Sequence, residues 1–291
     1  MRDSEHTTPG TGWRLIAVAT LAVALGVAIL PIQARALVTC PTASTGDADG
    51  DGLTDAQECA GITLNLGTAT AIIIPPCTAG LARSACLDPN AKDLFVIVVP
   101  AASGSLLAPG FNPFGTITVS GTNVGPINFS GFSALGITVH QITAAQAATD
   151  RTLSAGSTQK AARVAESLDT SDTILGVCNW GTPNALDGCV VYTQRIKNFI
   201  DSVCNAVPDT TTDRAAVFKA YTIHTFIHEV GHSLGGLTAT YDKRYGGYHY
   251  ASGSGIVMEQ AETYSTKGGK CTWSISAGWN TTLDPPAVRL R

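Results

Sequence analysis

The sequence predicts an α/β fold of the α+β type, in which a small, mixed and twisted β-sheet packs on one long helix and one or two backing helices. Three observations favour this fold. Residues 94–99 form a continuous apolar run that stops at Pro100, which is typical of a buried strand. Residues 116–140 contain short segments in which apolar and polar side chains alternate. Residues 213–236 combine a capping aspartate, an apolar body and a final pair of glycines, which indicates a helix.

The N-terminal region has the pattern of a secretory signal peptide. Arg14 precedes a continuous apolar stretch over residues 15–30, and Pro31 interrupts that stretch. Ala34 and Ala36 then supply the small residues of an A-x-A cleavage site. We therefore expect a signal peptide that is cleaved after Ala36.

Cleavage at that point would leave a secreted, extracellular chain that begins at Leu37 and has no membrane segment. The alternative is an uncleaved membrane anchor, although the apolar stretch is short for a helix that spans a bilayer. Lipid attachment at Cys40 is disfavoured because Thr39 is bulky for the position before a lipidated cysteine.

Length and charge limit the classes of function. The chain has 291 residues, which is enough for one large domain or two small ones. Its formal net charge is −4, and only 14% of its residues are charged. Because no basic patch is present, we expect no nucleic-acid partner. The mild acidity says little about the substrate.

The cysteines fit an exported protein. All eight lie after residue 36, and an even number in an oxidising compartment indicates four disulfides. Eight cysteines allow 105 pairings, so the sequence does not prove the connectivity. Pairing of nearest neighbours would give Cys40–Cys59, Cys77–Cys86, Cys178–Cys189 and Cys204–Cys271. Since the chain lacks a C-x-x-C motif, we do not expect cysteine ligands for zinc.

Residues 47–58 match the calcium-loop pattern D-x-D-x-D-G-x₅-E at every specified position. Such a loop wraps Ca²⁺ in carboxylates and one backbone carbonyl, and a glycine permits its sharp turn. The predicted ligands are Asp47, Asp49, Asp51, the carbonyl of Leu53, Asp55 acting through water, and Glu58. No long helix precedes this EF-hand-like loop, so it resembles the thrombospondin-type-3-like calcium loops of extracellular repeat proteins. We expect a structural calcium clip; the alternative is a solvated acidic turn.

The remaining elements are shorter. Residues 72–74, 116–119, 127–129, 137–140 and 173–177 are predicted strands, residues 157–168 are a predicted helix, and residues 188–204 are a predicted strand that runs into a helix. His140 is interpreted as an ordinary strand residue.

The long predicted helix carries the motif H-E-x-x-H at His228, Glu229 and His232. Residues four apart lie on one face of a helix, so the two imidazoles can bind one Zn²⁺. Glu229 lies beside the metal position, where a general base can take a proton from a water molecule. His224, one turn earlier, is interpreted as a neighbouring or core histidine. The alternative is a structural helix whose histidines are buried and hydrogen-bonded.

The motif continues as H-E-x-x-H-x-x-G with Gly235, and this resembles the first eight positions of the metzincin signature H-E-x-x-H-x-x-G-x-x-H. The resemblance implies a sharp turn at the glycine, a third zinc ligand after it, and a methionine turn beneath the site. Met258, in the segment Gly-Ile-Val-Met, is the residue that matches the methionine turn.

The third ligand departs from the signature, because Thr238 occupies its position. The next histidine is His249, nine residues before the methionine. The resemblance therefore implies an insertion of about eleven residues, over 238–248, with His249 as third ligand. The alternatives are Glu259 or Glu262, as in gluzincins, and Asp242.

The layout also resembles secreted bacterial metalloproteases in which a D-x-D-G-D-G-L-x-D-x-x-E loop precedes a K-D-[LIV]-F-V strand, as Lys92 and Asp93 introduce here. This resemblance covers residues 47–99 and 221–264. Some metzincins add a tyrosine that stabilises the oxyanion, for which Tyr248, Tyr250 and Tyr264 are the candidates.

Together these features predict three parts: a signal peptide over residues 1–36, a disulfide-stapled calcium segment over 37–86, and a zinc metallopeptidase domain over 87–291. We expect a monomeric, secreted zinc endopeptidase that acts on a protein or peptide substrate. The alternatives are another zinc hydrolase, such as a cell-wall peptide amidase, and a non-catalytic extracellular calcium-binding or adhesion module. Cleavage specificity and any latency mechanism are not indicated.

Overall fold

The structure is a computed structural model in which the chain divides into two units, Met1–Ala36 and Leu37–Arg291. All described residues belong to the second unit. They are residues 40, 45–64, 73–107, 117–119, 123–143, 153, 161–178, 188–205, 214–232, 234–235, 263–275, 279 and 289–290.

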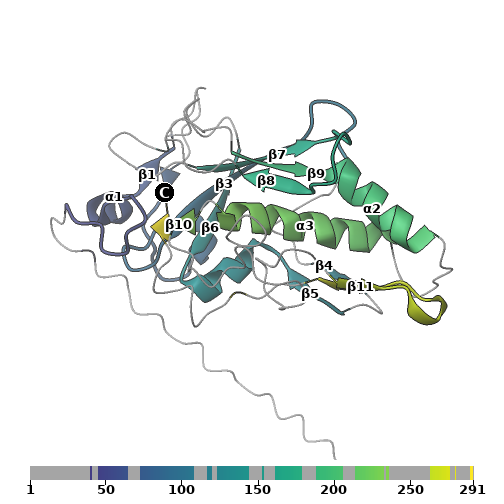
Figure 1. Ribbon diagram of the computed structural model, residues 1–291. Coiled ribbons are helices and arrows are strands. Elements are labelled where there is room, and N and C mark those ends of the chain that lie inside the picture. The colour runs from purple at the N-terminus through teal and green to yellow at the C-terminus, as the bar shows by residue number, and fades with distance from the viewer. Residues whose placement is uncertain are drawn as a thin grey trace, which may run out of the picture. The chain divides into compact units, whose positions relative to one another are not determined.

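A five-stranded, mostly parallel sheet forms the centre of this unit (Figure 1). Its strand order is β6-β3-β7-β9-β8, and only the edge strand β8 runs antiparallel to its neighbour. The strands are β3 (Asp93–Val99), β6 (Thr138–Ile142), β7 (Ala162–Ser167), β8 (Gly176–Cys178) and β9 (Cys189–Tyr192). The predicted α/β class is therefore confirmed.

Strand β3 is continuously apolar because both of its faces are buried. Leu94 and Val96 pack in the core that contains the apolar residues of the long helices. Phe95 and Ile97 pack in a second core together with Leu53 from the calcium-loop segment. Successive side chains of a strand point to opposite faces, so β3 separates the helical layer from the N-terminal segment.

Three α-helices are described: α1 (Asp55–Ala60), α2 (Thr193–Asn205) and α3 (Arg214–His232). Helix α3 is buried along its second half, where every residue from 220 to 232 is buried. It lies against β8 and β9 of the central sheet and against α2. The H-E-x-x-H motif therefore sits at the C-terminal end of a rigid, buried helix.

A second sheet has four strands in the order β11-β12-β5-β4. These strands are β4 (Ile117–Val119), β5 (Asn123–Ile127), β11 (Thr263–Ser265) and β12 (Thr272–Ile275). Two short pairs complete the strands, β1 (Ile62–Thr63) with β2 (Ile73–Ile74), and β10 (Leu234–Gly235) with β13 (Arg289–Leu290). The 3-10 helices are η1 (Arg83–Ala85), η2 (Phe129–Leu135) and η5 (Lys267–Gly269).

Two secondary-structure predictions are wrong. Residues 162–167 of the predicted helix form strand β7, because they lie between β3 and β9 and alternate buried and partly buried side chains. Tertiary pairing here outweighs the helix propensity of an alanine-rich segment. The strand predicted at 127–129 ends at Ile127, and the 3-10 helix η2 begins at Phe129.

The nearest-neighbour disulfide pairing is confirmed. The bonded pairs are Cys40–Cys59, Cys77–Cys86, Cys178–Cys189 and Cys204–Cys271. Within the described part of the chain, no helix has the length and the apolar character that crossing a membrane requires.

Candidate metal centres

The first centre lies at the C-terminal end of α3. The Nε2 atoms of His228 and His232 lie 3.1 Å apart, and both side chains are buried. Two nitrogen ligands of a tetrahedral zinc ion, each about 2.0–2.1 Å from the metal, are separated by roughly 3.3 Å. The distance is compatible with a shared metal ion and equally with a hydrogen bond between the two rings.

Glu229 lies beside this pair. One of its carboxylate oxygens is within 4.8 Å of ligand nitrogens of both His228 and His232. The residue is only 4% exposed, and its Oε2 accepts no hydrogen bond from the described residues. Burial raises the pKa of Glu229 to about 8. A buried carboxylate without donors is costly, and a nearby cation or a transferable proton would relieve that cost.

The edge strand β8 covers Glu229. Gly176 leaves the space that the carboxylate occupies, because a Cβ atom at this position would overlap Oε1 of Glu229. The sulfur atoms of Cys178 and Cys189 lie 2.7 Å and 3.1 Å from the backbone oxygen of Glu229. The disulfide therefore packs β8 and β9 against the turn of α3 that carries the motif.

Arg195 on α2 fixes the segment that leads into β8. Its Nη1 donates to the carbonyl of Ile174 at 2.8 Å, and its Nε donates to the carbonyl of Asp169 at 2.9 Å. The guanidinium also pairs with the Asp169 carboxylate and lies over the Tyr192 ring, 3.8 Å from its centroid. These contacts hold the segment that leads into β8 against α2.

The other predicted zinc-site residues are only partly described. The candidates for a third ligand, the methionine turn and two tyrosines lie outside the described residues: His249, Glu259, Glu262, Asp242, Met258, Tyr248 and Tyr250. The ring of His224 is 6.0 Å from that of His228, which fits a neighbouring histidine rather than a ligand. Tyr264 stacks on Trp273 and contacts Phe199, within an aromatic cluster that also contacts the middle of α3.

The second centre is the loop over residues 47–58. The Asp47 carboxylate accepts hydrogen bonds from the amides of residues 50, 51 and 52, at 2.7–3.1 Å. Asp49 accepts from the amide of Asp51, and Asp51 accepts from the amide of Leu53. Gly52 has a φ of 96°, a conformation that side-chain-bearing residues rarely adopt. The sequence pattern thus folds locally into a loop whose carboxylates turn inward.

Glu58, the last predicted ligand in the loop, is fully buried on α1. Both of its carboxylate oxygens lack a hydrogen bond from the described residues. Burial first, and then the neighbouring carboxylates, raise the pKa of Glu58 to about 10. The same causes raise the pKa of Asp49 to about 7. Such a group of inward carboxylates fits a hard divalent cation, because Ca²⁺ takes six to eight oxygen ligands.

Asp55 accepts a hydrogen bond from the amide of Ala48 at 2.8 Å, which closes the loop. Its predicted role through a water molecule stays a prediction. The side chain of Leu53 is fully buried in the second core, so the residue that supplies the predicted carbonyl ligand also anchors the loop. Helix α1 begins with a capping box in which Thr54 and Gln57 exchange hydrogen bonds.

Sequence reasoning missed one carboxylate, Asp93 at the start of β3. Ligand oxygens of Asp51, Glu58 and Asp93 all lie within 4.8 Å of one another. Its place in the K-D-[LIV]-F-V pattern that follows the loop was visible in the sequence, but the calcium-loop motif ends at Glu58 and assigns no ligand role to Asp93.

Comparisons of the chain with protein-family models, with curated proteins and with solved structures find no match.

Proposed function

We propose that this chain is a secreted zinc-dependent endopeptidase in which Glu229 acts as the general base. The observation that carries the proposal is the arrangement on α3: two imidazole nitrogens 3.1 Å apart, with a buried carboxylate beside them that lacks a full set of donors. The metzincin resemblance of the flanking sequence supports the same function.

His228 and His232 would hold the metal, with His249 as the third ligand that the resemblance implies. Nitrogen ligands of this kind suit zinc, and catalytic zinc sites use three protein ligands. Zinc bound there would lower the pKa of a water molecule and polarise the scissile carbonyl.

Glu229 would accept the proton that the water loses and deliver it to the leaving amine. Its position supports this role, because Gly176 and the surrounding burial hold the carboxylate on the metal side of α3. Strand β8 also has no strand partner on its outer edge among the described residues. An extended peptide could add to that edge through main-chain hydrogen bonds, beside Glu229.

The loop over residues 47–58 would bind a structural Ca²⁺. Its support is the fully buried Glu58, whose two oxygens face a group of carboxylates rather than donors. The four disulfides support a protein that matures in an oxidising compartment, as secretion requires.

A non-catalytic extracellular calcium-binding module is the second candidate. The described part of the chain favours it in one respect, because the loop supplies more ligands than the two histidines of α3 do.

The test compares the wild-type protein with Glu229→Gln in cleavage of unfolded casein, with zinc content measured on both. We expect cleavage to fall by about 10²–10⁴-fold or more in the variant while zinc is retained, because general base catalysis is lost. The matched control is Asp172→Asn, which removes one exposed carboxylate and should cleave like the wild type. Equal cleavage by wild type and Glu229→Gln, or a wild type that holds no zinc, would overturn the proposal.

A further inference from the structure

We propose that Asp93 is a ligand of the same Ca²⁺ that the loop over residues 47–58 binds, so that the cation joins the N-terminal segment to the central sheet. This inference rests on the calcium part of the proposed function and assigns a ligand that lies outside the loop motif.

The first observation is the environment of Glu58. Its side chain is fully buried, and both carboxylate oxygens lack a hydrogen bond from the described residues. Its oxygens face the carboxylates of Asp51 and Asp93, which are also buried. Three buried carboxylates in one group repel one another unless protons or a cation neutralise them, and a cation among them would let all three stay ionised.

The distances suit a single ion. One ligand oxygen from each of Asp51, Glu58 and Asp93 lies within 4.8 Å of the others. Oxygens that share one Ca²⁺ at 2.3–2.6 Å cannot be separated by more than about 5 Å. Asp51 also belongs to a group with Asp47 and Asp49 that meets the same limit. Because Asp51 is common to both groups, one cation can serve the loop and Asp93 together.

Asp93 is held in position by hydrogen bonds to both of its carboxylate oxygens. Its Oδ1 accepts from Nε2 of His140 at 2.7 Å, and its Oδ2 accepts from the amide of Asp88 at 3.2 Å. Hydrogen bonds to both oxygens do not exclude a metal, because an ionised carboxylate offers about four lone-pair sites. Carboxylate ligands are usually held by such outer hydrogen bonds, and His140 is held in turn by the carbonyl of Ser84 at 3.1 Å.

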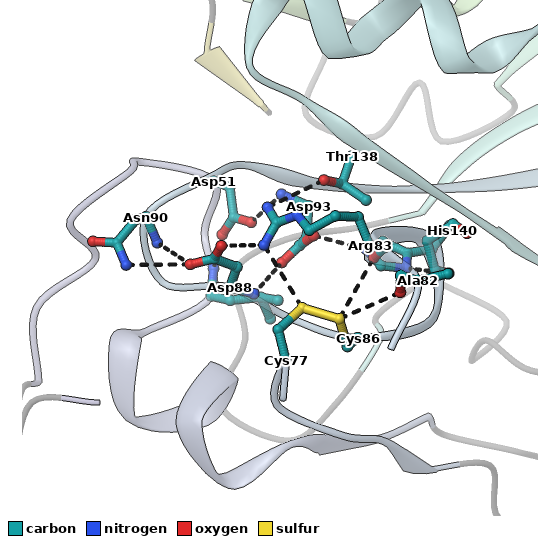
Figure 2. Close-up of polar contacts among 12 residues, drawn as sticks. Asp51, Cys77, Ala82, Arg83, Cys86, Asp88, Asn90, Asp93, Thr138 and His140 are labelled. Carbon is teal, nitrogen blue, oxygen red and sulfur yellow. Dashed lines mark hydrogen bonds and ion pairs between the residues drawn. A yellow bond between two sulfur atoms is a disulfide. The ribbon is translucent and has the colours of Figure 1, made fainter. Parts of the chain in front are cut away.

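The backbone already joins the loop to the strand at this point. The amide of Asp93 donates to Oδ2 of Asp51 at 2.7 Å, and Figure 2 shows Asp51 beside Asp93 with His140 on the other side. Asp93 pairs in register with Thr138 at the start of β6, and His140 stacks on Phe95, with ring centroids 4.7 Å apart. A cation on Asp93 would therefore stabilise the first residues of both β3 and β6.

Arg83 lies beside the proposed site and contacts Asp88 and Thr138. Its guanidinium pairs with Asp88 and donates to the hydroxyl of Thr138 at 3.3 Å (Figure 2). Asp88 thus has a cationic partner, although it lies only five residues before Asp93. Asp88 also belongs to none of the groups of possible metal ligands among the described residues, so Asp88→Asn supplies a matched control for the experiment.

The experiment is a calorimetric titration of the metal-free, full-length protein with CaCl₂, on the wild type, Asp93→Asn and Asp88→Asn. We expect Asp93→Asn to weaken calcium binding by about tenfold or more, because it removes one charged ligand. Asp88→Asn should bind like the wild type. Equal affinity of Asp93→Asn and the wild type would overturn the inference and leave the calcium loop intact. A wild type that binds no calcium would overturn the calcium part of the proposed function as well.

Hydrogen exchange of the wild-type protein tests the same inference if Asp93→Asn does not fold. We expect CaCl₂ to slow exchange at the amides that begin β3 and β6, as well as in the loop itself. Slower exchange confined to residues 47–58 would contradict a ligand on β3.

Discussion

The loop over residues 47–58 and the C-terminal end of α3 each place a buried glutamate in a group of possible metal ligands, but the two groups are assembled differently. The loop gathers its carboxylates from one continuous stretch, residues 47–58, and adds Asp93 from the neighbouring strand. Helix α3 contributes two nitrogens and a base within five residues. Each centre contains a buried glutamate with at least one oxygen that no described donor reaches, Glu58 in the loop and Glu229 on the helix.

A third buried glutamate shows what such a side chain looks like when its role is structural. Glu166 on β7 is 7% exposed and accepts hydrogen bonds from Ser105, Ala101, Thr193 and Leu106. Burial alone would raise the pKa of Glu166, but these donors bring it below its usual value. Missing donors, rather than burial itself, therefore distinguish Glu58 and Glu229 from the structural Glu166.

Removing calcium should produce the largest change. If free Ca²⁺ is about a thousandfold above its dissociation constant, binding stabilises the fold by about 4 kcal/mol. For a chain of this size, that corresponds to a melting temperature about 10 °C lower in calcium-free buffer with zinc present. Differential scanning calorimetry with and without CaCl₂ measures the shift. In Glu58→Gln, CaCl₂ should no longer raise the melting temperature. If CaCl₂ raised it as much as in the wild type, Glu58 would not be a calcium ligand.

The metal-free protein should lose stability as the pH rises. The folded-state pKa values are about 6 for Asp51, about 7 for Asp49 and about 8 for Glu229, all above the values of the unfolded chain. Between pH 5 and pH 8 the folded state therefore binds more protons than the unfolded state, and stability falls with increasing pH. We expect the melting temperature to drop by several degrees over this window without metals. With CaCl₂ present, the melting temperature should decline less over this pH range. A melting temperature that rises with pH in the metal-free protein would contradict the raised pKa values of these carboxyl groups.

Gly176→Ala should impair catalysis without unfolding the protein. The added methyl group would overlap the Glu229 carboxylate and displace it from the metal side of α3. We expect kcat/KM for peptide cleavage to fall about 10–100-fold, or about 1.4–2.8 kcal/mol, with zinc content unchanged. Val177→Ala is the control on the same strand, because its side chain points to the opposite face. Equal activity of both variants would show that β8 does not position Glu229.

Glu166→Gln should lower the stability of the metal-free protein, whereas Glu229→Gln should not. An amide in place of the Glu166 carboxylate turns acceptor sites into donors that face other donors, at a cost of about 1–3 kcal/mol. Glu229→Gln in the metal-free protein removes a carboxylate that lacks donors, so it should leave stability equal or higher. Urea denaturation at pH 7 measures both changes. A large loss of stability in Glu229→Gln would mean that this glutamate is structural.

Several elements of the fold and of the candidate site could be predicted because they depend on residues that are close together in the sequence. The helix with H-E-x-x-H and the apolar strand β3 are each defined by local spacing, and both were predicted correctly. The loop over residues 47–58 folds with its carboxylates close together, and its binding of calcium stays a prediction. The four disulfides join cysteines that are neighbours along the chain, so the simplest pairing was right.

The failures come from long-range packing. Residues 162–167 have the composition of a helix, but pairing on both sides makes them a central strand. No sequence pattern assigned a ligand role to Asp93 or a partner to His140, and the parallel pairing of β3 with β6 is what brings the two side chains together. The proposed third zinc ligand, His249, lies outside the described residues and stays a prediction.

The most direct test of the account is the metal content of the purified protein by mass spectrometry, for the wild type, Glu58→Gln and His232→Ala. The account predicts one zinc and one calcium per wild-type chain. Glu58→Gln should lose calcium and keep zinc, and His232→Ala should lose zinc and keep calcium. A wild type without zinc, or variants that lose both metals together, would contradict the proposal of two separate metal centres, one that contains Glu58 and one that contains Glu229.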